Sequence, residues 1–325
     1  MPGFTTHYIL GMKAYNDLPN NQLKYIIAKY RWLYQLGLQG PDMFFYNIPI
    51  LRHRDYRNVG SYMHEHKVNA FFECCLRRIG TIRSRQQQEE AISYLAGFMN
   101  HYIADSICHP YVYGRIGYPV DAPTSMHHGM HAHLENELDA ILLWKYKKKK
   151  PSEFNQTATI CLNGQEIQFI SHFLASCINE TYYPITYRNN FQVTPAMVHR
   201  SIWALRFGCR TLSDKTGKKK FGIAQVESIF VNHPVASAKM VTDSVTDYRS
   251  SCNLNHEAWG NPWDPTRVST ASFVDLFHET LDKCSRVYAL LNSAVTDNVP
   301  LDKQDLSPLL MELGNESYHS GLPVD

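Results

Sequence analysis

The amino-acid sequence predicts an all-α fold, a multi-helix single domain with one small β-hairpin near residues 157–169. Three observations support this fold class. Apolar residues recur at helical spacing along most of the chain, no pattern of alternating strands and helices occurs, and no internal repeat or Pro-rich linker divides the sequence. We therefore expect one domain over residues 1–315 and a flexible tail over residues 316–325.

Helices dominate the N-terminal half, where we expect them near residues 4–15, 20–36, 60–79, 85–108 and 127–147. The fourth is the best defined, because Ser84 and Gln87 make a capping-box signal ahead of its apolar repeat. Pro110 marks its expected end. Gly97 lies one turn before His101 on the same face, so we expect another helix to approach closely there.

The remaining elements follow from local turn and cap signals. Asn163-Gly164 inside the segment TATICLNGQEIQF predicts the hairpin. A helix is expected over QFISHFLASCIN, and another begins where Thr194 supplies an N-cap and Pro195 a first helical residue. The last strong helix is expected from about residue 272 to residue 293.

Composition excludes several classes of protein. A formal net charge of +2 over 325 residues creates no strong field for nucleic acid or an anionic membrane. Eight cysteines are too few for a disulfide scaffold in a chain of this length. No signal-peptide pattern or membrane-spanning apolar run occurs, so we expect a cytoplasmic protein. The sixteen histidines are the excess that needs an explanation.

Histidines and carboxylates at helical spacing predict a site for metal ions. An α-helix turns about 100° per residue, so His101, Asp105 and His109 in HYIADSICHP fall within an arc of roughly 80°. His131 and Glu135 in HAHLENELD are neighbours one turn apart on a second helix. For any single residue a hydrogen-bonded core position is the ordinary alternative, but several such segments together favour metal.

Three further segments add candidate ligands. THYILG contains His7, GPDMFFY contains Asp42, and GSYMHEHK contains His64 and His66. His64 shares a helical face with apolar residues, whereas His66 points about 200° away, so we expect His64 to be the inward ligand. Weaker candidates are His127, His128 and His133.

This pattern resembles the zinc-dependent phospholipase C family, whose all-helical fold is shared by the fungal single-strand-specific nucleases. The resemblance covers roughly residues 4–145 and depends most on HYIADSICHP and HAHLENELD. It implies a phosphoester hydrolase with two or three Zn²⁺ ions. By this resemblance one ion is held by His64, His101 and Asp105 with Asp42 as a further ligand, a second by His109, His131 and Glu135, and a third by His7 with Asp105 bridging.

The chain departs from the family at its N-terminus. No tryptophan precedes His7, although an N-terminal tryptophan also chelates the third ion in the family, so two or three ions are both left open. The missing secretion signal fits a bacterial subfamily better than a secreted toxin. The oligomeric state is not set by the sequence.

The implied chemistry is attack of a metal-activated water on phosphorus, with catalytic roles for Asp42 and Asp105. Three carboxylates leave two or three dications electropositive, which favours phosphate. Phe45 and Tyr46 would contact substrate or pack in the core, and Trp259 and Trp263 would line a cleft or cover the core.

The substrate implied is a phosphoester, either a phospholipid or a soluble head-group ester. Two alternatives stay open: a nuclease on the same fold, and a non-catalytic metal-binding protein of this fold. No stable nucleic-acid complex is expected, because the lysine runs at 145–150 and 218–220 are short.

Overall fold

The computed structural model describes residues 3–46, 58–183, 192–214, 216–230, 237–245 and 247–325. The α-helices are α1 (Phe4–Asp17), α2 (Gln22–Lys29), α3 (Arg31–Gly37), α5 (Val59–Glu65), α6 (Val68–Thr81), α7 (Arg85–Arg115), α8 (Ser125–Lys147), α9 (Gly164–Tyr182), α10 (Pro195–Leu212), α11 (Lys218–Phe230), α12 (Tyr248–Ser251), α13 (Phe273–Thr296) and α14 (Ser307–Leu313). The 3₁₀ helices are η1 (Gly40–Tyr46), η2 (Pro151–Glu153), η3 (Gln156–Thr159), η4 (Ser237–Lys239) and η5 (Leu301–Lys303). The strands are β1 (Trp259–Asn261) and β2 (Asp264–Ser269), which pair antiparallel. The all-α fold class is confirmed.

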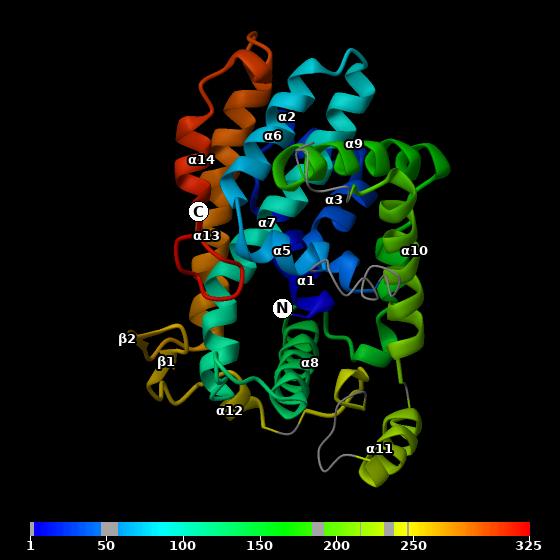
Figure 1. Cartoon of the computed structure of the whole chain (residues 1–325), viewed down its shortest axis with the longest axis vertical. Coiled ribbons are helices and arrows are strands. Elements are labelled where there is room, and N and C mark those ends of the chain that lie inside the picture. Colours follow the sequence, from blue (N-terminus) through cyan, green and yellow to red (C-terminus); the bar gives the residue numbers. More distant parts are fainter. Residues whose placement is uncertain (1–2, 47–57, 184–191, 215, 231–236, 246) are drawn as a thin grey trace.

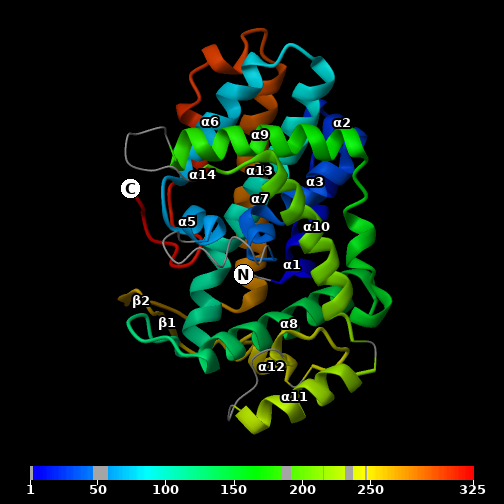
Figure 2. The ribbon, with the colours of Figure 1, turned by 45° about the vertical axis from the view of Figure 1, so that its right-hand side comes forward.

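The long helix α7 forms the centre of the molecule. It contacts α3, α13, α1 and α2 along its length, and α9 lies across the bundle beside α6 and α10 (Figures 1 and 2). Its N-terminal part contributes Phe98 and Tyr102 to one apolar core, and its C-terminal part contributes Tyr111 and Val112 to a second. Residues 101–109 lie where these two cores meet, and nearly all of them are buried.

A pair of glycines brings α3 against α7. A Cβ atom at Gly97 would lie 2.1 Å from the carbonyl oxygen of Tyr34, and one at Gly37 would lie 2.1 Å from that of Tyr94. The two helix backbones thus touch, as Gly97 predicted. Because α3 leads directly into η1, this contact also sets the position of Asp42.

The predicted helix end at Pro110 is wrong. Helix α7 continues to Arg115, and Pro110 lies buried in its interior. A proline there removes one backbone hydrogen bond, which local reasoning takes as a helix end. The C-terminal segment packs on this turn, where a Cβ atom at Gly321 would lie 2.5 Å from the carbonyl oxygen of Ser106, so tertiary packing overrides the local signal.

The predicted hairpin near 157–169 is also wrong. This stretch forms η3 and the beginning of α9, and Asn163 is the N-cap of that helix. The Asn163 side chain accepts a hydrogen bond from the backbone N–H of Glu166 at 2.9 Å, and the Glu166 carboxylate accepts one from the backbone N–H of Asn163 at 2.8 Å. The sequence NGQE is thus a capping box, while the small sheet lies at β1 and β2.

Other predicted helices are confirmed with adjusted bounds. The stretch 20–36 is divided into α2 and α3 at Tyr30, and the stretch 60–79 into α5 and α6 at Lys67, whose φ is 50°. Thr194 caps α10 as expected, and Ser272, the expected beginning of the last strong helix, is the N-cap of α13. Among the described helices, none is both long enough and apolar enough to cross a membrane.

The last ten residues do not form the expected flexible tail. Tyr318 is buried with 1% exposure, and its amide donates to the carbonyl of His64 at 3.0 Å. The Lys67 amide donates to the Asp325 carbonyl at 3.0 Å, and the Val324 amide to Asn315 at 2.9 Å. The segment, red in Figure 1, is therefore attached to α5 and belongs to the folded core.

Candidate metal centre

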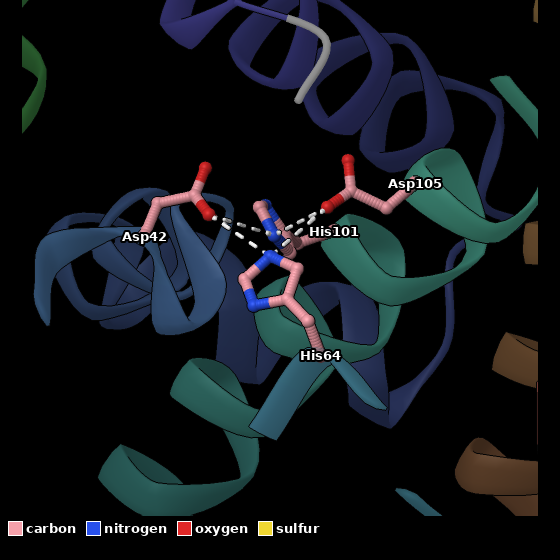
Figure 3. Close-up of side chains that lie close together, drawn as sticks. All are labelled: Asp42, His64, His101 and Asp105. Carbon is pink, nitrogen blue, oxygen red and sulfur yellow. Dashed lines mark ion pairs between the residues drawn. The ribbon is translucent and has the colours of Figure 1, made fainter. Parts of the chain in front are cut away.

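Four buried side chains from three elements converge in one cluster. Asp42 comes from η1, His64 from α5, and His101 and Asp105 from α7 (Figure 3). Each offers one nitrogen or oxygen atom, and these atoms all lie within 4.8 Å of one another. We call these four residues the first cluster.

The nitrogen and oxygen atoms in the first cluster face one another. The Nε2 atom of His101 lies 3.2 Å from Asp105 Oδ2, and that of His64 lies 3.3 Å from Asp42 Oδ1. The cross distances are 3.6 Å from His64 Nε2 to Asp105 and 3.7 Å from His101 Nε2 to Asp42. Two imidazoles and two carboxylates facing one point form a donor set that zinc prefers.

Backbone carbonyls orient the histidines. The Nδ1 atom of His64 lies 2.7 Å from the carbonyl oxygen of Gly60. The Nδ1 atom of His101 lies 3.1 Å from the carbonyl oxygen of Leu38. In a neutral imidazole, an Nδ1–H that donates to such a carbonyl leaves the Nε2 lone pair free to bind metal. The fold thus directs both Nε2 atoms into the first cluster.

Several buried atoms of this region lack a hydrogen-bond partner among the described residues. They are Asp42 Oδ1, His64 Nε2, His101 Nε2, His109 Nε2 and both carboxylate oxygens of Asp105. Buried polar atoms without hydrogen bonds are costly and rare, and such a large number in one place therefore needs an explanation. A divalent cation coordinated by these atoms would satisfy them together.

Charge in the first cluster is distributed unevenly. Burial lowers the pKa of His64, but the neighbouring Asp105 and Asp42 outweigh burial and raise it to about 9. Burial raises the pKa of Asp105, yet His109, His101 and His7 hold it well below its usual range. Without a metal the first cluster therefore contains an ionised Asp105 and a protonated His64, whose positive charge a metal cation would replace.

A second cluster lies beside the first. It consists of His109 from α7 and of His131 and Glu135 from α8. Glu135 Oε1 lies 2.6 Å from His131 Nε2 and 3.8 Å from His109 Nε2. Burial lowers the pKa of His109 to about 4, so this imidazole is neutral and able to bind metal at physiological pH. Asp105 Oδ2 lies 3.8 Å from His109 Nδ1 and so lies between the two clusters.

His7 reaches the first cluster from α1. Its Nε2 atom lies 3.2 Å from Asp105 Oδ1, and its ring stacks on His101 with centroids 4.0 Å apart. Asp139 of α8 anchors the beginning of α1 by accepting hydrogen bonds from the amides of Thr5 and Thr6 at 3.0 and 2.7 Å. All eight residues predicted as ligands therefore lie in or beside the two clusters.

A family model described as zinc dependent phospholipase C matches residues 6–186, more than half of the chain. The chain belongs to the zinc-dependent phospholipase C family. The matched region contains all the residues of both clusters, together with His7. No curated protein and no solved structure matches the chain significantly.

The other histidines considered from the sequence lie outside both clusters of this zinc-dependent phospholipase C family member. His66 is half-buried at the end of α5, and its ring packs at a tilt against Tyr62, with centroids 4.4 Å apart. His127 contacts the Thr124 hydroxyl at 2.9 Å, and His133 lies 3.5 Å from Glu137. Neither they nor His128 join a cluster among the described residues.

The predicted aromatic contacts fall into two groups. Phe45 lies beside the first cluster, with its ring 5.3 Å from that of His64, and Trp263 lies 4.9 Å from the ring of Tyr113. By contrast, Tyr46 packs against α10 at Gly208, and the Trp259 indole donates to the Ala271 carbonyl at 2.9 Å. Phe45 and Trp263 thus lie near the clusters, whereas Tyr46 and Trp259 pack against the protein core.

Sequence reasoning missed the contribution of the C-terminal segment. The Tyr318 carbonyl lies 2.6 Å from His109 Nδ1, and the His319 ring stacks on His64 with centroids 4.9 Å apart. Tyr113, also missed, lies 4.6 Å from the His131 ring. The only sequence signal for His319 was the excess of histidine, because the segment has no helical repeat.

Proposed function

We propose that this protein is a zinc-dependent phosphoester hydrolase of the phospholipase C type. The observation that supports this most strongly is the pair of adjacent clusters, each combining buried imidazole nitrogens with at least one carboxylate. In the first cluster, the Nε2 atoms of His64 and His101 have no hydrogen-bond partner among the described residues. Asp105 lies between the two clusters, close to His101 and His109. Adjacent metal sites of this composition are typical of phosphoester hydrolysis.

The donor geometry supports an assignment of ligands. Asp42, His64, His101 and Asp105 would hold one zinc ion, and His109, His131 and Glu135 would hold a second. His7 Nε2 lies 3.2 Å from Asp105 Oδ1, so these two residues would together hold a third ion. The contact with Asp105 and the stacking on His101 support His7 in this role.

Charge makes the loaded site attractive to phosphate. The carboxylates of Asp42, Asp105 and Glu135 supply three negative charges, fewer than the four positive charges of two zinc ions. Bound zinc supplies Lewis acidity and lowers the pKa of water at the site. The clusters are enclosed by protein, and low local polarity strengthens attraction between this excess positive charge and a phosphoryl group.

The protein's own residues would divide the remaining work. Asp42 would take the proton from the attacking water, since its carboxylate adjoins both histidines of the first cluster. Asp105, fully buried between the clusters, would keep them at a constant separation. Phe45, next to His64, would contact the non-reacting part of the substrate.

The test is hydrolysis by the zinc-loaded full chain. We expect release of p-nitrophenol from bis(p-nitrophenyl) phosphate or p-nitrophenyl phosphorylcholine, loss of release after chelation, and recovery when zinc is restored. Hydrolysis of dispersed phosphatidylcholine would indicate phospholipase activity, whereas hydrolysis of single-stranded DNA would indicate nuclease activity. A protein that binds two zinc ions per chain but hydrolyses none of these substrates would contradict the proposal and favour a metal-binding role.

A further inference from the structure

The C-terminal segment places an additional imidazole next to both clusters. The His319 ring stacks on His64 of the first cluster, with centroids 4.9 Å apart and planes 14° apart. It also lies 5.6 Å from the His109 ring of the second cluster. His319 lies outside the region matched by the family model, residues 6–186, so this imidazole is an addition from the C-terminal part of the chain.

The backbone on both sides of His319 is held firmly. Just before it, the Tyr318 amide donates to the His64 carbonyl at 3.0 Å, and the Tyr318 carbonyl lies 2.6 Å from His109 Nδ1. Just after it, the Ser320 carbonyl accepts from the Asn261 side chain at 2.8 Å. The position of the imidazole is therefore set by the same residues that set the clusters.

His319 is placed as a hydrogen-bond donor rather than as a ligand. Neither group of converging ligand atoms found among the described residues includes it. The Tyr113 hydroxyl lies 3.3 Å from His319 Nδ1. If the Tyr113 hydroxyl donates to Nδ1, Nε2 is the ring nitrogen that carries a proton and can donate. Unlike the buried ligands of the first cluster, His319 is partly exposed.

We propose that His319 binds the phosphoryl group of the substrate by donating a hydrogen bond from Nε2 to a non-bridging oxygen. The inference rests on the proposed function, since it takes the ligand of the site to be a phosphate ester. Hydrogen bonds to an anionic oxygen are roughly twice as strong as those between neutral groups.

The experiment uses the zinc-loaded full chain and inorganic phosphate as the probe. Phosphate affinity by calorimetry, zinc per chain, thermal midpoint and hydrolysis rate are measured for the wild type, His319→Ala and His319→Gln. His66→Ala is the matched control, because His66 is also a partly buried histidine in contact with another ring but lies outside both clusters. Glutamine carries an amide N–H on a chain long enough to replace Nε2–H.

We expect His319→Ala to keep its zinc and to bind phosphate about tenfold more weakly or worse, as loss of a hydrogen bond to a charged group predicts. His319→Gln should recover part of the affinity, and His66→Ala should match the wild type. If His319→Ala does not fold, His319→Phe takes its place, because phenylalanine keeps a ring against His64 but carries no N–H; unchanged phosphate affinity in that variant would contradict the proposal.

Three results would overturn the inference: unchanged phosphate affinity in His319→Ala, loss of zinc from that variant, or no phosphate binding by the zinc-loaded wild type. Loss of zinc would mean that the ring only supports the ligands it contacts. Failure of the proposed function looks different. In that case the wild type would hydrolyse no phosphoester, while phosphate binding and its dependence on His319 would persist.

Discussion

Replacing Asp105 with asparagine is expected to lower zinc content and turnover together. Asp105 is approached by four imidazoles, with distances of 3.2 Å to His7, 3.2 Å to His101, 3.6 Å to His64 and 3.8 Å to His109. Asparagine preserves the shape of the side chain but removes one of the two negative charges of the first cluster. Both clusters and the position of His7 should therefore be affected.

The size of the effect follows from burial. Asp105 is fully buried, and removing one partner from a buried charge pair costs about 3–5 kcal/mol. At about 1.4 kcal/mol per tenfold, this corresponds to a loss of between about 10² and 10⁴ in zinc affinity. The assay is elemental analysis after dialysis against buffered zinc, together with the hydrolysis rate of the same samples.

The matched control is Glu90→Gln, an equivalent charge removal at a buried position of the same helix, outside both clusters. It should keep the wild-type zinc content and rate. If Asp105→Asn also retained its full zinc content, the placement of Asp105 between two ions would be refuted. A loss of zinc in both variants would instead indicate general damage to α7.

Three further predictions test other parts of the structure. By elemental analysis, His64→Ala should lose about one zinc ion per chain and His66→Ala none, because of these two histidines only His64 lies in the first cluster. A larger loss of zinc from His66→Ala than from His64→Ala would overturn the choice of His64 as a ligand. Gly97→Ala should lower the free energy of unfolding, measured by urea denaturation, by about 1–3 kcal/mol, because the new Cβ would meet the backbone of α3. Gly164→Ala is the control, and it should change the free energy of unfolding by less than about 1 kcal/mol, because the space around Gly164 is open. Equal losses in the two variants would contradict the close approach of α3 and α7. Zinc affinity, measured by competition with a chromophoric chelator, should rise from neutral pH until about pH 9, because zinc displaces the proton of His64, whose pKa is raised to about 9; a flat profile would argue against His64 as a ligand.

The cluster residues that share one helix were predictable from the sequence. His101, Asp105 and His109 keep their spacing whatever surrounds them, and His131 with Glu135 follows the same rule, so periodicity alone aligned them. The apolar face of its segment predicted that His64 points inward, and His64 is buried in the first cluster. The continuous helix assumed for it was wrong, however, because the chain turns at Lys67, between α5 and α6.

The errors share a physical cause, which is that distant contacts overrode local signals. Pro110 stays helical because the C-terminal segment and the second core enclose its turn. Asn163 is equally suited to a turn and to an N-cap, and only Glu166 three residues later favours the cap. The C-terminal segment contacts His64 and His109, residues more than 200 positions away, and no local pattern encodes such contacts.

The central claim is that the two clusters are metal sites, and the most direct test is the number of moles of metal per chain in gently purified protein. Elemental analysis should find two or three zinc ions, with the second cluster emptied by His131→Ala and the first retained. Less than one zinc ion per chain, with no uptake when zinc is added, would contradict the account and make these histidines part of an ordinary core.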